Sequence, residues 1–178
     1  VTMLENSLCK WFAKKIGFND YSGGIAASGG TLSNLNALIA ARYNAGLGSD
    51  PNSVLIVSED AHSSFIKCTR IMGLHDTNLI KIKTDNKGCM DINNLKKSLD
   101  QCSIDNKKIF AIVATLGTTI RGAIDPIKDI SDICKKKNIW FHIDGSIGGI
   151  FALTSVPIEG LSKINQANSI TINPQKII

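Results

Sequence analysis

The sequence lacks the features of a membrane protein or of a disulfide-stabilised secreted one. No apolar run approaches the roughly 20 residues that a membrane-spanning helix needs, and residues 1–6 do not form the basic-then-apolar start of a signal peptide. The five cysteines are odd in number, widely spaced and without a C-x-x-C pair, which argues against a disulfide framework and a zinc site. We therefore expect a cytoplasmic protein with no bound metal and no membrane partner.

Aromatic side chains are also scarce, at 6% of the residues, and this bears on the net charge of +5. The lysines are scattered or occur in short runs such as Lys135–Lys137, beside an expected helix end, where cations stabilise the helix dipole. Surfaces that bind single-stranded nucleic acids combine basic residues with aromatic ones. We expect a solvated basic face and no nucleic-acid partner, although a positive field favours an anionic ligand.

What the sequence does contain is a regular alternation of helical and strand patterns. Its 178 residues, 43% of them hydrophobic, are enough for one domain with a real core. The expected helices are residues 4–16, Leu32–Tyr43, His62–Met72, Asp91–Leu99 and Pro126–Lys137, and the expected strands are Val54–Val57, Leu79–Ile82, Phe110–Ala114, Ile139–Ile143 and Ser169–Ile172. This order predicts an α/β fold in which helices flank a largely parallel sheet.

Two polar residues follow expected strands, at the sheet edge where ligands of parallel sheets collect. Asp144 comes directly after Ile139–Ile143. It either acts on a ligand or serves only as a turn residue that hydrogen-bonds its own backbone. His62 follows Val54–Val57 on the same edge, where an imidazole can stack on a flat ring or shuttle protons. His142 lies inside a strand and is interpreted as structural.

Three further segments carry polar groups that have two interpretations each. Ser28–Thr31 opens a helix and either presents backbone N–H groups to an anion or forms an ordinary glycine turn with Thr31 as helix cap. Thr119 ends a Thr-Thr pair after a strand and hydrogen-bonds either a ligand or a turn. Lys176 follows an Asn-Pro turn and is either solvated or desolvated in a crevice, where its amine can form a Schiff base.

Together these groups supply an anion cradle, an imidazole, an acid and an amine at one edge of one sheet. That is the set of contacts that pyridoxal phosphate needs. A carboxylate beside the pyridine nitrogen keeps this nitrogen protonated, and the protonated ring then withdraws electrons when a bond at the substrate α-carbon breaks. The sequence therefore predicts pyridoxal phosphate as the cofactor.

On these motifs the chain resembles the group II pyridoxal-phosphate-dependent amino acid decarboxylases of fold type I, which include glutamate, aromatic amino acid and cysteine sulfinate decarboxylases. The matching segments follow the family's order along nearly the whole chain: Ser28–Asn34 with Ala40–Tyr43, Ser58–Ser64, Ala114–Thr119, His142–Asp144 and Asn173–Lys176. The resemblance implies a single cofactor-binding large domain over residues 1–178, truncated at both ends, without the family's N-terminal segment and small C-terminal domain.

The resemblance also implies a role for each matching position. Lys176 would form the internal aldimine, Asp144 would pair with the pyridine nitrogen, and His62 would stack on the ring. The remaining cofactor-binding positions, toward the phosphate or beside the ring, would be Gly30, Thr31, Thr119, Ser146, Asn173 and Gln175.

The chain departs from the family's pattern at two places. Gln175 stands where the family usually has a histidine before the lysine, so a hydrogen-bonding group remains but any proton transfer is lost. Gly145, Ser146 and Ile147 stand where two alanines and an aromatic residue are usual, so packing under the ring would differ. Neither departure removes a group that the chemistry requires.

The activity implied by the resemblance is the decarboxylation of an L-amino acid by a carboxy-lyase that is a homodimer in its full-length form. Two alternatives remain open from the sequence. One is another fold-type-I lyase or an aldehyde-forming enzyme that keeps the cofactor and the lysine. The other is a non-catalytic, truncated chain.

Overall fold

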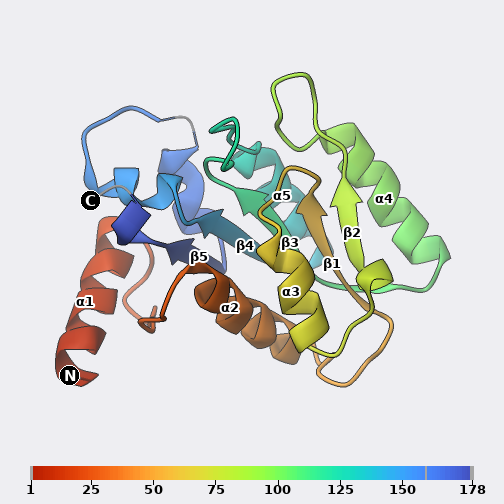
Figure 1. The fold of residues 1–178 in the computed structure, drawn as a ribbon, viewed down its shortest axis with the longest axis horizontal. Helices are drawn as coiled ribbons and strands as arrows, with labels where there is room; N and C mark the ends of the chain where they lie inside the picture. The colour runs from red at the N-terminus through yellow and green to blue at the C-terminus, as the bar shows by residue number, and fades with distance from the viewer. Residues whose placement is uncertain (1, 159, 177–178) are drawn as a thin grey trace.

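The apolar runs of the sequence form one sheet of five strands, and every neighbouring pair in it is parallel. A computed structural model describes residues 2–158 and 160–176. The strands lie in the order β2-β1-β3-β4-β5, with bounds Ser53–Ser58 (β1), Leu79–Ile82 (β2), Lys108–Thr115 (β3), Trp140–Gly145 (β4) and Ser169–Ile172 (β5) (Figure 1). The predicted α/β fold with a parallel sheet is confirmed.

Helices cover both faces of this sheet. Helices α2 and α3 pack on one face, and α4 and α5 pack on the other (Figure 1). The bounds are Thr2–Lys15 (α1), Gly30–Asn44 (α2), Ser64–Ile71 (α3), Ile92–Ile104 (α4) and Ile127–Lys137 (α5), with short 3-10 turns at Asp76–Asn78 (η1), Gly148–Leu153 (η2), Leu161–Gln166 (η3) and Pro174–Lys176 (η4). Because side chains on both faces are covered, β1 is buried along its whole length, which explains its continuous apolar run.

Two element boundaries differ from the prediction in ways that affect the functional edge. The predicted strand Ile139–Ile143 in fact extends through Asp144 to Gly145, because β5 continues the ladder and pairs Asp144 with Thr171. The acid therefore lies inside the strand and not after it. The predicted helix His62–Met72 begins only at Ser64, so His62 lies in the turn between β1 and α3.

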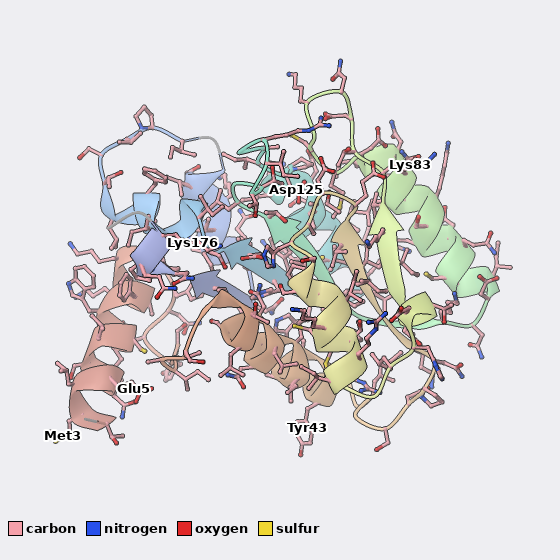
Figure 2. All side chains as sticks on the ribbon, viewed as in Figure 1. Met3, Glu5, Tyr43, Lys83, Asp125 and Lys176 are labelled. Atoms are coloured by element: carbon pink, nitrogen blue, oxygen red, sulfur yellow. The ribbon has the colours of Figure 1, made fainter. Side chains whose placement is uncertain are left out.

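The first helix forms where helical spacing predicted it, but its apolar residues are largely exposed. Leu4 is 75% exposed and Leu8 is 50% exposed, whereas Ala13 is buried. The helix lies at one side of the molecule (Figure 1), and Met3 lies at its outer end (Figure 2). Within residues 2–158 and 160–176, no helix combines the length and the apolar character needed to cross a membrane.

Candidate functional site

One cavity of about 550 Å³ lies at the carboxyl ends of the central strands, where α2 begins. Thr115 of β3 and Asp144 of β4 contribute to its wall, together with residues in the segments that follow β1, β3, β4 and β5. The structure brings together in this wall all the residues predicted for the site: Gly30, Thr31, His62, Thr119, Asp144, Ser146, Asn173, Gln175 and Lys176.

The start of α2 is shaped to receive an anion. Its N-cap is Gly29, at φ 150° and ψ 168°, a conformation that glycine adopts far more readily than other residues, and no side chain of the described residues caps the helix. The first intrahelical bond runs from Ser33 N to Gly29 O at 3.0 Å, so the preceding N–H groups of the first turn have no intrahelical partner. Thr31 lies inside the helix, and its interpretation as the helix cap is wrong. Backbone donors and the helix dipole both favour an anion here.

Two glycines allow α2, β4 and β5 to approach closely at this end. A Cβ added to Gly30 would lie 2.7 Å from Ser146 Oγ. A Cβ added to Gly145 would lie 2.8 Å from the backbone oxygen of Thr171. An alanine at position 145, as the resembled family usually has, would therefore push β4 and β5 apart.

Asp144 is 4% exposed and accepts three hydrogen bonds. Asn34 Nδ2 donates to Oδ2 at 3.1 Å, while Ser146 donates to Oδ1 through both its backbone N at 3.1 Å and its Oγ at 2.6 Å. The bond from Ser146 N is the turn contact that one of the two interpretations of Asp144 predicted. Asp144 therefore stabilises its own turn and also lines the cavity. A carboxylate has about four acceptor positions, which leaves room for a cationic N–H from the cavity.

His142 is fully buried beneath Asp144, with both ring nitrogens paired. Nδ1 lies 2.8 Å from Ser169 Oγ, and Nε2 lies 3.1 Å from Asn34 Oδ1. Burial lowers the pKa of His142 to about 4, although the nearby Asp144 carboxylate acts in the opposite direction. The imidazole is therefore neutral, and its interpretation as a structural histidine is confirmed. The sequence did not predict Asn34 as a residue of the site. The one feature that could have indicated it is its position as a polar residue on the buried face of α2.

His62 is held by the residue that starts α3. Ser64 N lies 3.2 Å and Ser64 Oγ lies 2.8 Å from His62 Nδ1. Because the backbone N–H can only donate, Nδ1 is an acceptor, and the proton of the neutral ring is on Nε2. The imidazole lines the cavity in this fixed orientation. Ser64 was not predicted, although a serine two residues after a histidine can bond it in a turn.

The remaining wall comes from the ends of β3 and β5. Lys176 is exposed on η4 beside the carboxyl end of β5 (Figure 2). Thr119 is exposed and lines the cavity, whereas Thr118 is buried and its Oγ1 accepts from Ala123 N at 3.0 Å. Thr115, the ladder partner of Asp144, also lines the cavity, and its buried Oγ1 has no hydrogen-bond partner among the described residues.

A second buried carboxylate, that of Asp125, lies outside the cavity and binds the backbone at Met90 and at the end of β3. Asp125 accepts from Met90 N at 2.6 Å and from Thr115 N at 2.7 Å. Burial raises the pKa of Asp125 to about 6, against the effect of these two bonds. The sequence carries no signal for Asp125, because the burial of this residue depends on a loop 35 residues earlier in the chain.

Comparison with known proteins shows the family of the chain that forms this cavity. A family model described as the pyridoxal-dependent decarboxylase conserved domain matches residues 1–178. The chain belongs to the pyridoxal-dependent decarboxylase family. Pyridoxal phosphate is accordingly the cofactor of this family's domain.

The chain spans only about a third of the length of the relatives it matches. It is 33% identical to the acidic amino acid decarboxylase GADL1 of Xenopus tropicalis over 99% of the chain and 36% of that protein. It is 32% identical to an aromatic-L-amino-acid decarboxylase of Bacillus atrophaeus over 97% of the chain and 36% of that protein. The crystal structure of mouse CSAD superposes with a TM-score of 0.90 at 29% identity, covering 96% of this chain and 37% of that one.

The cavity of this decarboxylase domain fits the cofactor on three local observations. Within the part of the chain that the structure describes, the α2 N-terminus has free donors and no side-chain cap, and the buried Thr115 Oγ1 in the wall has no hydrogen-bond partner. Asp144 offers acceptor positions toward the cavity. An anionic group, a ring hydroxyl or oxygen, and a protonated ring nitrogen would satisfy these groups. Among the described residues, no three His, Cys, Asp or Glu side chains are grouped as a metal site.

Proposed function

We propose that the full-length protein is a carboxy-lyase that decarboxylates an L-amino acid with pyridoxal phosphate, and that residues 1–178 form its cofactor-binding large domain. One observation carries the proposal. The uncapped start of α2, the acid of β4 and the lysine of η4 line a single cavity of about 550 Å³. These elements come from three distant parts of the chain, so their convergence is a property of the fold.

The phosphate end of the cofactor would bind at the start of α2. Gly30 and Thr31 provide backbone N–H groups there, and the absence of a Cβ at Gly30 leaves space beside Ser146. Asn173 and Gln175 line the same cavity and carry amide donors that suit phosphate oxygens. Gln175 would therefore hold the phosphate by hydrogen bonding without adding a positive charge.

The ring of the cofactor would lie between His62 and the end of β4. Asp144 would accept a hydrogen bond from the protonated ring nitrogen, Thr119 would bond near the ring, and the imidazole of His62 would cover one ring face. When bound, the cofactor withdraws electrons from the substrate α-carbon as the carboxylate leaves. Lys176 Nζ would hold the cofactor covalently until the substrate amine replaces it, and then remains nearby as an amine able to hold a proton.

Two features of the whole protein belong to the same proposal. We propose a homodimer, because Leu4, Leu8 and Trp11 expose apolar surface along α1 that another chain would cover. We also propose a cytoplasmic location. Light scattering of the full-length protein and fractionation of the source cells test these two points separately.

The test of the reaction is a screen of individual L-amino acids with full-length protein and pyridoxal phosphate. We expect CO2 and the corresponding amine from at least one of them. Lys176→Ala should abolish both CO2 release and the borohydride-stable attachment of the cofactor. Aldehyde in place of amine would assign the chain to an aldehyde-forming enzyme, and unchanged CO2 release by Lys176→Ala would disprove the proposed role of the lysine.

A further inference from the structure

A chain of side-chain hydrogen bonds runs from the first residue of β4 to the cavity. Trp140 Nε1 lies 2.8 Å from Ser169 Oγ, which lies 2.8 Å from His142 Nδ1. On the other side of the imidazole, His142 Nε2 lies 3.1 Å from Asn34 Oδ1. Asn34 Nδ2 in turn lies 3.1 Å from Asp144 Oδ2. The network therefore connects β4, β5 and α2.

The two ends of this network fix the direction of every bond in it. An indole N–H can only donate, and a carboxylate can only accept. Trp140 thus donates to Ser169 at one end, and Asp144 accepts from the NH2 group of Asn34 at the other. Asn34 Oδ1 therefore faces His142 Nε2 and accepts its proton. Because the imidazole is neutral, Nδ1 carries no proton and accepts from the Ser169 hydroxyl. This assignment gives each of the four hydrogen bonds one donor and one acceptor.

Burial makes this assignment energetically important. Asn34 is 1% exposed and His142 is not exposed at all, so water cannot replace a lost partner. If the Asn34 amide were reversed, its oxygen would face a carboxylate oxygen of Asp144 at about the same 3.1 Å. His142 opposes that reversal, because its Nε2–H needs an acceptor on Asn34.

We propose that Asn34 and His142 are positioning residues that hold the Asp144 carboxylate in one orientation, as an acceptor for a protonated ring nitrogen in the cavity. Asn34 fixes Oδ2 and Ser146 fixes Oδ1, so the plane of the carboxylate is set from both sides. Trp140 and Ser169 act one step further away, by fixing the tautomer of His142. This inference rests on the proposed function, which makes Asp144 the partner of the cofactor ring.

The first experiment examines the network in full-length protein without cofactor. Nuclear magnetic resonance of protein labelled with 15N-histidine should show His142 as the neutral Nε2–H tautomer at pH 7, with a slowly exchanging proton. Asn34→Leu and Ser169→Ala should shift these resonances. Detection of the Nδ1–H tautomer or of imidazolium at pH 7 would overturn the proposal.

Two controls match these variants. Asn36→Leu makes the same change on the same helix outside the network. Thr171→Val removes a different contact between β5 and α2, the 3.2 Å bond from Thr171 Oγ1 to Ser33 Oγ. Both controls should leave the His142 resonances in place, and an equal shift in Asn36→Leu would show that the effect of Asn34→Leu is not specific to the network.

The second experiment measures the dissociation constant of pyridoxal phosphate by equilibrium dialysis. Asn34→Leu and His142→Phe should weaken binding about tenfold or more, since each leaves the carboxylate or its support without a buried donor. They should also move the pH at which the visible absorption of the bound cofactor changes. His142→Gln keeps a donor toward Asn34 and should bind within about threefold of the unsubstituted protein. If Asn34→Leu does not fold, Asn34→Ser, which is too short to bridge His142 and Asp144, replaces it.

The outcomes separate this inference from the proposed function. If Asn34→Leu and His142→Phe bind pyridoxal phosphate within twofold and keep the same pH profile, the positioning role is wrong and the proposed function stands. If the unsubstituted protein does not bind pyridoxal phosphate, the proposed function fails, and the resonance experiment alone decides whether the network exists as assigned.

Discussion

Gly30 and Ser146 lie next to each other in the cavity wall, and their close approach requires that residue 30 has no side chain. A Cβ on Gly30 would come within 2.7 Å of Ser146 Oγ, the atom that donates to Asp144 at 2.6 Å. The first turn of α2 and the end of β4 are thus coupled through one hydroxyl group.

Gly30→Ala should therefore weaken pyridoxal phosphate binding, because the new methyl group displaces Ser146 and occupies space at the anion-binding helix start. Overpacking of this kind typically costs about 1–3 kcal/mol. Gly30→Ala combined with Ser146→Ala should recover part of the loss, since the second change removes the atom that clashes. Dialysis of the two single variants and the double variant measures this coupling, and strictly additive losses would show that the contact is not responsible.

Arg42 should contribute strongly to stability, because its buried guanidinium donates to three backbone oxygens. These belong to Leu47 at 2.9 Å, Met72 at 2.7 Å and Asp50 at 3.0 Å. Arg42→Met would remove three hydrogen bonds and leave Met72 O without a donor among the described residues, whereas Leu47 O still accepts from Asp50 N and Asp50 O still accepts from Ser53. We expect a loss of about 1–3 kcal/mol in urea unfolding. Arg70→Met, which removes an exposed ion pair with Asp76, is the matched control and should change the midpoint little.

The pH dependence of stability should contain two opposing contributions. The pKa of His142 is lowered by burial from 6.5 to about 4, so the unfolded chain binds the extra proton between these values. Its contribution to stability is complete above pH 6.5 and is lost as the pH falls toward 4. The pKa of Asp125 is raised by burial from 3.8 to about 6. Its contribution is complete below pH 3.8 and is lost as the pH rises through 6.

Asp125→Asn should reveal the histidine contribution alone. Between pH 6 and pH 4 the variant should lose stability more steeply than the unsubstituted protein, by on the order of 2 kcal/mol over the range. Its loss of one backbone bond is independent of pH and does not affect this slope. Urea unfolding at half-unit pH steps provides the measurement. His142→Gln should show the reverse slope difference, and parallel curves for all three proteins would contradict the assignment of both groups.

The anion site at the start of α2 predicts a dependence on the phosphate group. Pyridoxal without phosphate should bind at least tenfold more weakly than pyridoxal phosphate, because it cannot use the free N–H groups of Gly30 and its neighbours. Inorganic phosphate should compete with pyridoxal phosphate in the same dialysis. Equal affinity for the two compounds would exclude this helix end as the phosphate site.

The alternation of elements could be predicted from the sequence because strands covered on both faces form continuous apolar runs such as Val54–Val57. The convergence of strand ends followed from the parallel arrangement. What could not be predicted depends on partners far away in the chain. β4 extends past Asp144 only because β5 pairs with it. The function of Asn34 depends on a residue 110 positions later. Helical spacing predicted α1 correctly but contained no information on whether Leu4 and Leu8 would be buried.

The placement of α2 against β5 also has a consequence for synthesis of the chain on the ribosome. Helix α2 packs on the last strand of the sheet, and the bond from Thr171 to Ser33 spans 138 residues. At about 5–20 residues per second, the ribosome needs roughly ten seconds between completing α2 and completing β5. During this interval α2 lacks its contact with β5, although Leu35 and Leu38 already have their cluster partners on β1, α3 and β3. The cofactor site, whose wall includes Asn173, Gln175 and Lys176, can therefore form only at the end of this interval.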